Sequence, residues 1–181
     1  ALDAQAGGAH RIELCANLDA DGLTPPDDLL LACVNQVALP VFIMIRPREG
    51  SFVFTGDEAE RMLRQTRQAR TLGARGLVVG ALDDRGHIDA TVVAALVREA
   101  HGLPVTFHRA FDRLADMDAA LDDLASLGVS RVLTSGGAPT ALEGADVLAR
   151  LVRQAGARIV VVAGGGVRAH HVRDVVARTG V

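Results

Sequence analysis

The 181-residue sequence contains no tryptophan, no tyrosine and no basic tail. Its formal net charge is −3, and no segment combines basic with aromatic residues. Nucleic-acid-binding proteins usually carry a basic patch or stripe together with a recognisable binding motif. We therefore expect no nucleic acid among the partners of this protein.

Long apolar runs and paired cysteines are also lacking. The longest apolar runs are far shorter than the ~20 residues that a membrane-spanning helix needs, and the start shows no signal-peptide pattern. The two cysteines, Cys15 and Cys33, form no C-x-x-C pair and suggest no disulfide framework. We expect a cytoplasmic protein, in a reducing compartment, without a membrane partner.

What the sequence does contain is a repeat of short apolar runs. Apolar residues make up 49% of the chain, and its length suits one domain over residues 1–181. Segments with helical periodicity separate the runs, which predicts βαβ units and a parallel sheet. The predicted strands are Arg11 to Cys15, Val41 to Arg46, Gly76 to Ala81, Val105 to His108, Arg131 to Ser135 and Arg158 to Ala163.

The number of units favours a barrel. A helix without its strand precedes the six strands, and an empty strand position follows them. One strand added at each end makes eight, so we predict an α/β fold, a TIM-type (β/α)8 barrel whose first and last strands are missing from the chain. The alternative is an open, doubly wound sheet of six strands. No single switch-point fingerprint supports that alternative.

Two helix starts carry sequence signals. Thr24 followed by Pro25 predicts an N-cap with proline at the first helical position. Asp57 with Glu60 three residues later predicts a capping box.

Active sites of such barrels gather at the carboxyl ends of the strands. In the first strand, the period of two puts Glu13 and Cys15 on the face that points into the barrel. Glu13 is a candidate acid/base or ligand-orienting group. The alternative is a structural ion pair with Arg11 or Arg46, because a lone buried charge is costly.

The second strand ends with two arginines, Arg46 and Arg48, on either side of a proline. A guanidinium binds carboxylate or phosphate with a fixed fork of donors. Both arginines are therefore candidate ligands for a planar anion, and a surface salt bridge is the alternative.

Polar residues are dense at the end of the fourth strand. His108 should point into the mouth of the barrel, where it could act as a general acid/base or a metal ligand. Arg109 follows it as a candidate anion-binding residue, and Asp112 as a candidate catalytic residue. A buried, hydrogen-bonded histidine without such a role is the alternative.

The last two strands run into glycine. One continues as Thr134, Ser135 and Gly136, and the other as Gly164 and Gly165, and each is expected to lead into a helix. Glycine lets backbone N–H groups approach an anion closely, so both loops are candidate phosphate sites. Tight turns without a ligand are the alternative.

Several long motifs together resemble the CutC family, known as copper homeostasis proteins, over essentially the whole chain. The resemblance implies a TIM-type barrel, a cytoplasmic location and a role in copper handling. It also implies one further strand before the six predicted here, which carries its own Glu-x-Cys motif, and one further strand after them, which carries a His-Ser type motif. This chain lacks both of these outer strands. The motifs that carry the resemblance are Gly7 to Cys15, Gly22 to Pro25, Ile43 to Arg48, Val105 to Asp112, Val132 to Gly136 and Gly164 to Gly166.

Three functions remain open. Copper(I) prefers thiolate, thioether and imidazole, which Cys15, Met44 and His108 could supply as ligands. The alternative is a barrel enzyme that acts on a small anionic substrate, such as a phosphorylated one. A regulatory protein that binds such a ligand without turnover is the third.

The exposed sheet edges also suggest a homo-oligomer in which strands of different copies pair.

Overall fold

The computed structural model describes residues 1–181, which form one sheet of six parallel strands. All six predicted strands are confirmed, each somewhat shorter than expected. The strands are β1 (Ile12–Leu14), β2 (Val41–Met44), β3 (Gly76–Val79), β4 (Val105–Phe107), β5 (Arg131–Thr134) and β6 (Val160–Ala163). The helices are α1 (Leu2–Ala6), α2 (Asp27–Gln36), α3 (Gly56–Thr71), α4 (Ala90–Glu99), α5 (Met117–Ser126), α6 (Ala145–Ala155) and α7 (Val172–Thr179), with 3₁₀ turns η1 (Leu18–Ala20) and η2 (Arg109–Arg113).

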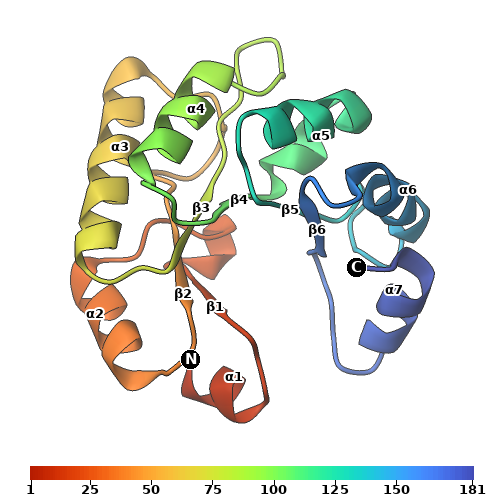
Figure 1. Ribbon diagram of the computed structural model, residues 1–181, viewed down its shortest axis with the longest axis horizontal. Coiled ribbons are helices and arrows are strands. Elements are labelled where there is room, and N and C mark those ends of the chain that lie inside the picture. The colour runs from red at the N-terminus through yellow and green to blue at the C-terminus, as the bar shows by residue number, and fades with distance from the viewer.

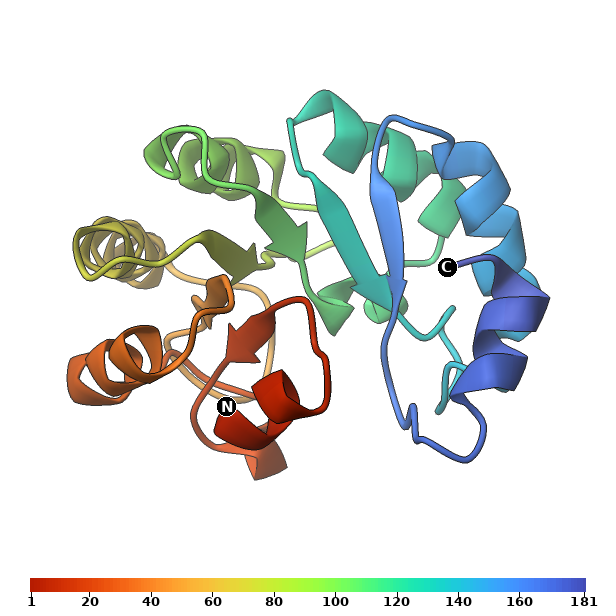
Figure 2. The same cartoon turned by 60° about the horizontal axis from the view of Figure 1, so that its bottom comes forward.

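The strand order decides between the two architectures that the sequence allowed. The order in the sheet is β1-β2-β3-β4-β5-β6, the same as in the chain. A doubly wound sheet reverses direction at a switch point, whereas a barrel continues around one axis. The strands form an open arc with helices outside it (Figures 1 and 2). The fold is therefore a half-barrel of the TIM type.

Alternation along β2 separates the two sides of this arc. Val41, Ile43 and Ile45 are buried in the apolar layer between the strands and α2 and α3. Phe42 and Arg46 point to the inner side, as the period of two requires. Met62 of α3 is fully buried in the same layer, and replacing such a methionine by alanine typically costs 2–5 kcal/mol.

The arc is open because β1 and β6 each have only one neighbouring strand. Val160 of β6 pairs with Arg131 and remains 56% exposed. None of the helices combines the length and the apolar character required to cross a lipid bilayer.

Both predicted helix starts are wrong by a few residues. Helix α3 begins at Gly56 with Thr55 as its N-cap, and Glu58 completes the capping box. Helix α2 begins at Asp27, because the hydroxyl of Thr24 is used elsewhere: it accepts the backbone N–H of Arg46 at 2.8 Å.

Candidate functional site

A cavity of about 360 Å³ opens where the strands end. Its volume is in the range of small-molecule sites. The residues that line it and matter for its chemistry come from the ends of β2 and β4, from η2 and from the loops between them. They are Asp21, Met44, Arg46, Phe52, His108, Arg109 and Asp112.

Arg46 is a buried cation that forms no direct ion pair, although the charges of Asp21 and Glu49 act on it. The residue is 3% exposed. Its Nη1 donates to the carbonyl oxygen of Ala20 at 2.6 Å, and its Nη2 donates to that of Gly50 at 3.1 Å. The guanidinium carbon lies 4.7 Å from the centroid of the Phe52 ring. Burial lowers the pKa of Arg46, but an arginine side chain remains protonated in proteins.

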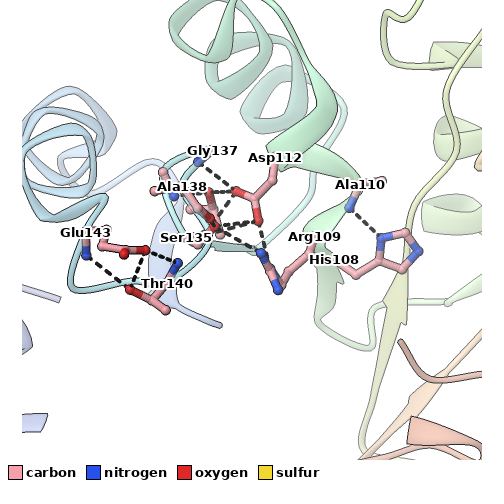
Figure 3. Close-up of polar contacts among 11 residues, drawn as sticks. His108, Arg109, Ala110, Asp112, Ser135, Gly137, Ala138, Thr140 and Glu143 are labelled. Carbon is pink, nitrogen blue, oxygen red and sulfur yellow. Dashed lines mark hydrogen bonds and ion pairs between the residues drawn. The ribbon is translucent and has the colours of Figure 1, made fainter. Parts of the chain in front are cut away.

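His108 is a buried, neutral imidazole. The residue is 4% exposed, and burial together with the positive charge of Arg46 lowers the pKa of His108 to about 3. Its Nδ1 accepts the backbone N–H of Ala110 at 3.1 Å (Figure 3). A neutral imidazole has one protonated nitrogen, so Nε2 carries the hydrogen and acts as a donor.

The two residues share an unusual feature, since each has a buried N–H group with no hydrogen-bond partner in the chain. These groups are the Nε of Arg46 and the Nε2 of His108. A buried donor without an acceptor costs about 1–3 kcal/mol. Both side chains line the same cavity, but the two nitrogen atoms themselves are buried in its wall.

Asp112 is fully engaged by the loop after β5. Its carboxylate accepts the side-chain N–H of Arg109 at 2.8 Å and the backbone N–H groups of Ser135 at 3.0 Å and Gly137 at 3.2 Å. The Thr134 hydroxyl also donates to it (Figure 3 shows this cluster). The carboxylate thus holds η2 against the β5 loop, and its oxygens are not free to move protons.

The loop at Gly136, predicted to bind phosphate, uses its N–H groups within the chain. The backbone N–H of Gly136 donates to the hydroxyl of Thr134 at 2.9 Å, and its neighbours donate to Asp112. Helix α6 begins only at Ala145, so this glycine loop does not lead directly into a helix. The chain's own carboxylate occupies the place that we predicted for an external anion.

The second glycine loop also differs from the prediction, because its first N–H group is used within the chain and no helix follows directly. The backbone N–H of Gly164 donates to the carbonyl oxygen of Thr134 at 2.8 Å. Helix α7 begins only at Val172, after a long loop. Gly165 lies against the guanidinium of Arg109, since a Cβ there would be 3.2 Å from its central carbon. This glycine makes room for Arg109, whose Nη2 donates to the Ser135 hydroxyl at 3.1 Å.

Glu13 is not brought into this cavity. Its register partner is Phe42, and Arg46 lies four residues further along the chain, about 13 Å away in an extended strand. Glu13 instead forms the expected ion pair with Arg11, at 3.1 Å, and both line a separate hollow near His10.

Arg48 is also unavailable to a ligand. Its Nε donates to the carboxylate of Glu58 at 2.5 Å, and its two terminal nitrogens donate to the carbonyl oxygens of Ser51 and Val53, both at 2.8 Å. Arg48 therefore fastens the loop after β2 to the start of α3.

The proposed copper ligands are only partly assembled. His108 offers no lone pair toward the cavity, because its Nδ1 is used by Ala110 and its Nε2 carries hydrogen. No group of three His, Cys, Asp or Glu side chains is placed to hold a metal ion. Cys15 and Met44 both lie close to Gly22. A Cβ built there would lie 3.1 Å from the Cys15 sulfur and 3.5 Å from the Met44 methyl group. Burial and the charge of Glu13 raise the pKa of the Cys15 thiol.

Phe52, which contacts both Arg46 and His108, was not among the site residues predicted from the sequence. Its ring centroid is 5.0 Å from that of the imidazole, and it comes from a loop without a motif. Gly80 was also missed, although a glycine in a predicted strand can mark a close approach of another group.

Comparisons with known proteins agree with this architecture. The model of the CutC family matches residues 1–181. A CutC family protein of Xanthomonas axonopodis pv. citri is 47% identical over 180 residues, which cover 99% of this chain and 75% of that protein. The human protein named copper homeostasis protein cutC homolog is 46% identical over 180 residues, covering 99% and 66%.

Solved structures show the same fold. The crystal structure of CutC from Streptococcus agalactiae has a TM-score of 0.91 and 33% identity, covering 96% of this chain and 86% of that one. QR15, an aldolase, has a TM-score of 0.66 at 16% identity, covering 84% and 71%. The second likeness concerns the fold alone.

Proposed function

The chain belongs to the CutC family, and from this premise we propose that it binds a small anionic ligand at the mouth of the half-barrel. The observation that carries the proposal is the pair of unpartnered buried N–H groups of Arg46 and His108 in one cavity. A carboxylate or phosphate in the cavity would lie beside the positive charge of Arg46, and its oxygens would accept from these N–H groups after a small movement of the two side chains. Arg46 would supply the charge, since its terminal nitrogens donate only to carbonyl oxygens of the chain.

The protonation state of His108 favours binding over acid–base catalysis. A histidine with a pKa of about 3 stays neutral near pH 7 and does not take up a proton there. Asp112 uses its oxygens within the chain. His108 would therefore hold and orient a ligand rather than carry a proton, and Asp112 would fix the loop around it. A binder without turnover is the function that this geometry supports best.

The test is a titration of the protein with inorganic sulfate, monitored through the backbone amide NMR signals of the residues that line the cavity. We expect millimolar affinity, and Arg46→Gln should weaken it at least tenfold. Arg64→Gln is the matched control, because Arg64 lies exposed on α3 and its loss changes the net charge equally. Equal affinity of the wild type and Arg46→Gln, or equal losses in both variants, would contradict the proposal.

Copper(I) binding is the second candidate, favoured by the approach of both Cys15 and Met44 to Gly22. A thiolate and a thioether are both ligands that Cu(I) prefers, and the human relative is named for copper homeostasis. Copper bound by Cys15 and Met44 would be cargo rather than a resident cofactor. Both cysteines are free thiols, which suits a reducing cytoplasm.

Competition with a chromophoric Cu(I) chelator tests this candidate. Cys15→Ser should weaken Cu(I) binding at least tenfold, and Cys33→Ser, a change inside α2, should leave it unchanged. Affinity should rise with pH, because the Cys15 thiol has a raised pKa and must lose its proton to bind. A Cys15→Ser variant that binds Cu(I) as the wild type does would exclude this site.

A further inference from the structure

We propose that Gly80 is a positioning residue for the anion site, because the absence of a side chain there leaves room for the imidazole of His108 in the wall of the cavity. The inference rests on the proposed function and adds to it a residue that does not itself line the cavity.

The imidazole fills the space that a side chain at position 80 would occupy. A Cβ built on Gly80 would lie 2.3 Å from Cε1 of His108, 2.5 Å from its Nδ1 and 2.9 Å from its Nε2. Real Cβ atoms essentially never approach another heavy atom within 3.0 Å. All three atoms belong to one rigid ring, so no flexible end of a side chain could move aside.

Backbone conformation does not explain this glycine. Gly80 is not among the glycines with positive φ, so its backbone conformation does not exclude other residues. What requires glycine is the close approach of His108, a role that glycine often has next to a strand.

Two contacts hold the ring in its present position. The Phe52 ring packs against it, with 5.0 Å between ring centroids, and the Ala110 N–H bonds its Nδ1 at 3.1 Å. An alanine at position 80 would need a contact of about 3.4 Å instead of 2.3 Å. The imidazole would have to shift by about 1 Å, which breaks the bond to Ala110 and displaces the ring from its place in the cavity wall.

The same strand provides a matched control. Gly76 lies four residues earlier on the same face of β3, and a Cβ there would meet the ring of Phe42 at 2.5 Å. Gly76→Ala therefore introduces a clash of the same kind, but far from the mouth. It should lower stability without changing the anion site.

The experiment combines sulfate titration with the imidazole ¹⁵N signals of His108. Gly80→Ala should weaken sulfate binding at least tenfold and shift the Nδ1 signal, which reports the lost bond to Ala110. Gly76→Ala should leave affinity within twofold of the wild type and the signal unchanged. Unchanged affinity and signals in Gly80→Ala would overturn the inference.

A double-variant cycle shows whether Gly80 acts through the ring. In a His108→Ala background no imidazole remains to clash, so adding Gly80→Ala should change sulfate affinity less than twofold. If Gly80→Ala alone does not fold, the double variant should fold, because the clash is gone. A double variant that also fails to fold, or that loses affinity as strongly as the single change, would refute the inference.

The two proposals fail in different ways. If wild-type protein does not bind sulfate, the proposed function is lost, but the ¹⁵N signals and the folding of the double variant still report on Gly80. If sulfate binds through Arg46 and Gly80→Ala leaves it untouched, only the inference on Gly80 is lost.

Discussion

The Asp112 carboxylate accepts both the backbone N–H and the hydroxyl of Ser135, each at 3.0 Å. Its side chain is only 8% exposed. Backbone N–H groups in a glycine loop form a nest that suits an anion, and here the anion belongs to the chain itself. The contact joins two consecutive β/α units and sets the orientation of Arg109 at the cavity.

Asp112→Asn should lower the free energy of unfolding by about 2–3 kcal/mol. The new amide group would place hydrogens opposite the N–H and O–H donors that now reach the carboxylate, and one buried oxygen cannot satisfy them all. Urea unfolding monitored by circular dichroism measures the change.

Asp146→Asn is the matched control for this variant. Its side chain is 98% exposed and pairs with Arg178 at 3.3 Å, and exposed pairs contribute little. We expect no measurable loss of stability there. If Asp112→Asn is no more destabilising than Asp146→Asn, the carboxylate is not holding the loop.

Arg48→Gln should lower the urea midpoint and leave sulfate affinity within twofold of the wild type. The reason is that Arg48 donates to Glu58 and to carbonyl oxygens of its own loop, and none of its groups is left for a ligand. Unfolding curves and sulfate titration on the same samples separate the two effects. A variant with unchanged stability and weakened sulfate binding would restore the interpretation of Arg48 as an anion ligand.

The fold was predictable because its signals are local. Each strand is a short run of Val, Ile and Leu, and the spacing between runs leaves room for one helix. The boundaries were less certain, as the start of α3 shows: Thr55 and Asp57 are both good capping residues two positions apart. The structure selects Thr55, because Glu58 then reaches back to its N–H at 2.8 Å.

The site was only partly predictable, because depth along a barrel depends on the stagger between strands. The period of two correctly turned Arg46, His108 and Glu13 inward. It could not show that Glu13 pairs with Phe42 and so lies far below the mouth. Likewise, Arg46 and Arg48 have the same local pattern, and only the path of the following loop gives Arg48 a carboxylate partner.

The pH dependence of stability follows from His108. Its pKa is about 3 in the folded state against 6.5 for an unperturbed histidine. Between these values the unfolded chain binds the additional proton, so stability rises with pH. The contribution is fully present above pH 6.5 and is lost as the pH falls toward 3.

Comparison of the wild type with His108→Gln isolates this contribution, since glutamine does not titrate. Between pH 7 and pH 5 the wild type should lose about 2 kcal/mol more than the variant, at up to ~1.4 kcal/mol per pH unit below 6.5. Urea unfolding at several pH values measures both slopes. His10→Gln, at an exposed histidine, should keep the wild-type slope. Parallel profiles of the wild type and His108→Gln would mean that the imidazole is not held neutral. A protonated ring carries hydrogen on both nitrogens, so Nδ1 could then not accept the N–H of Ala110.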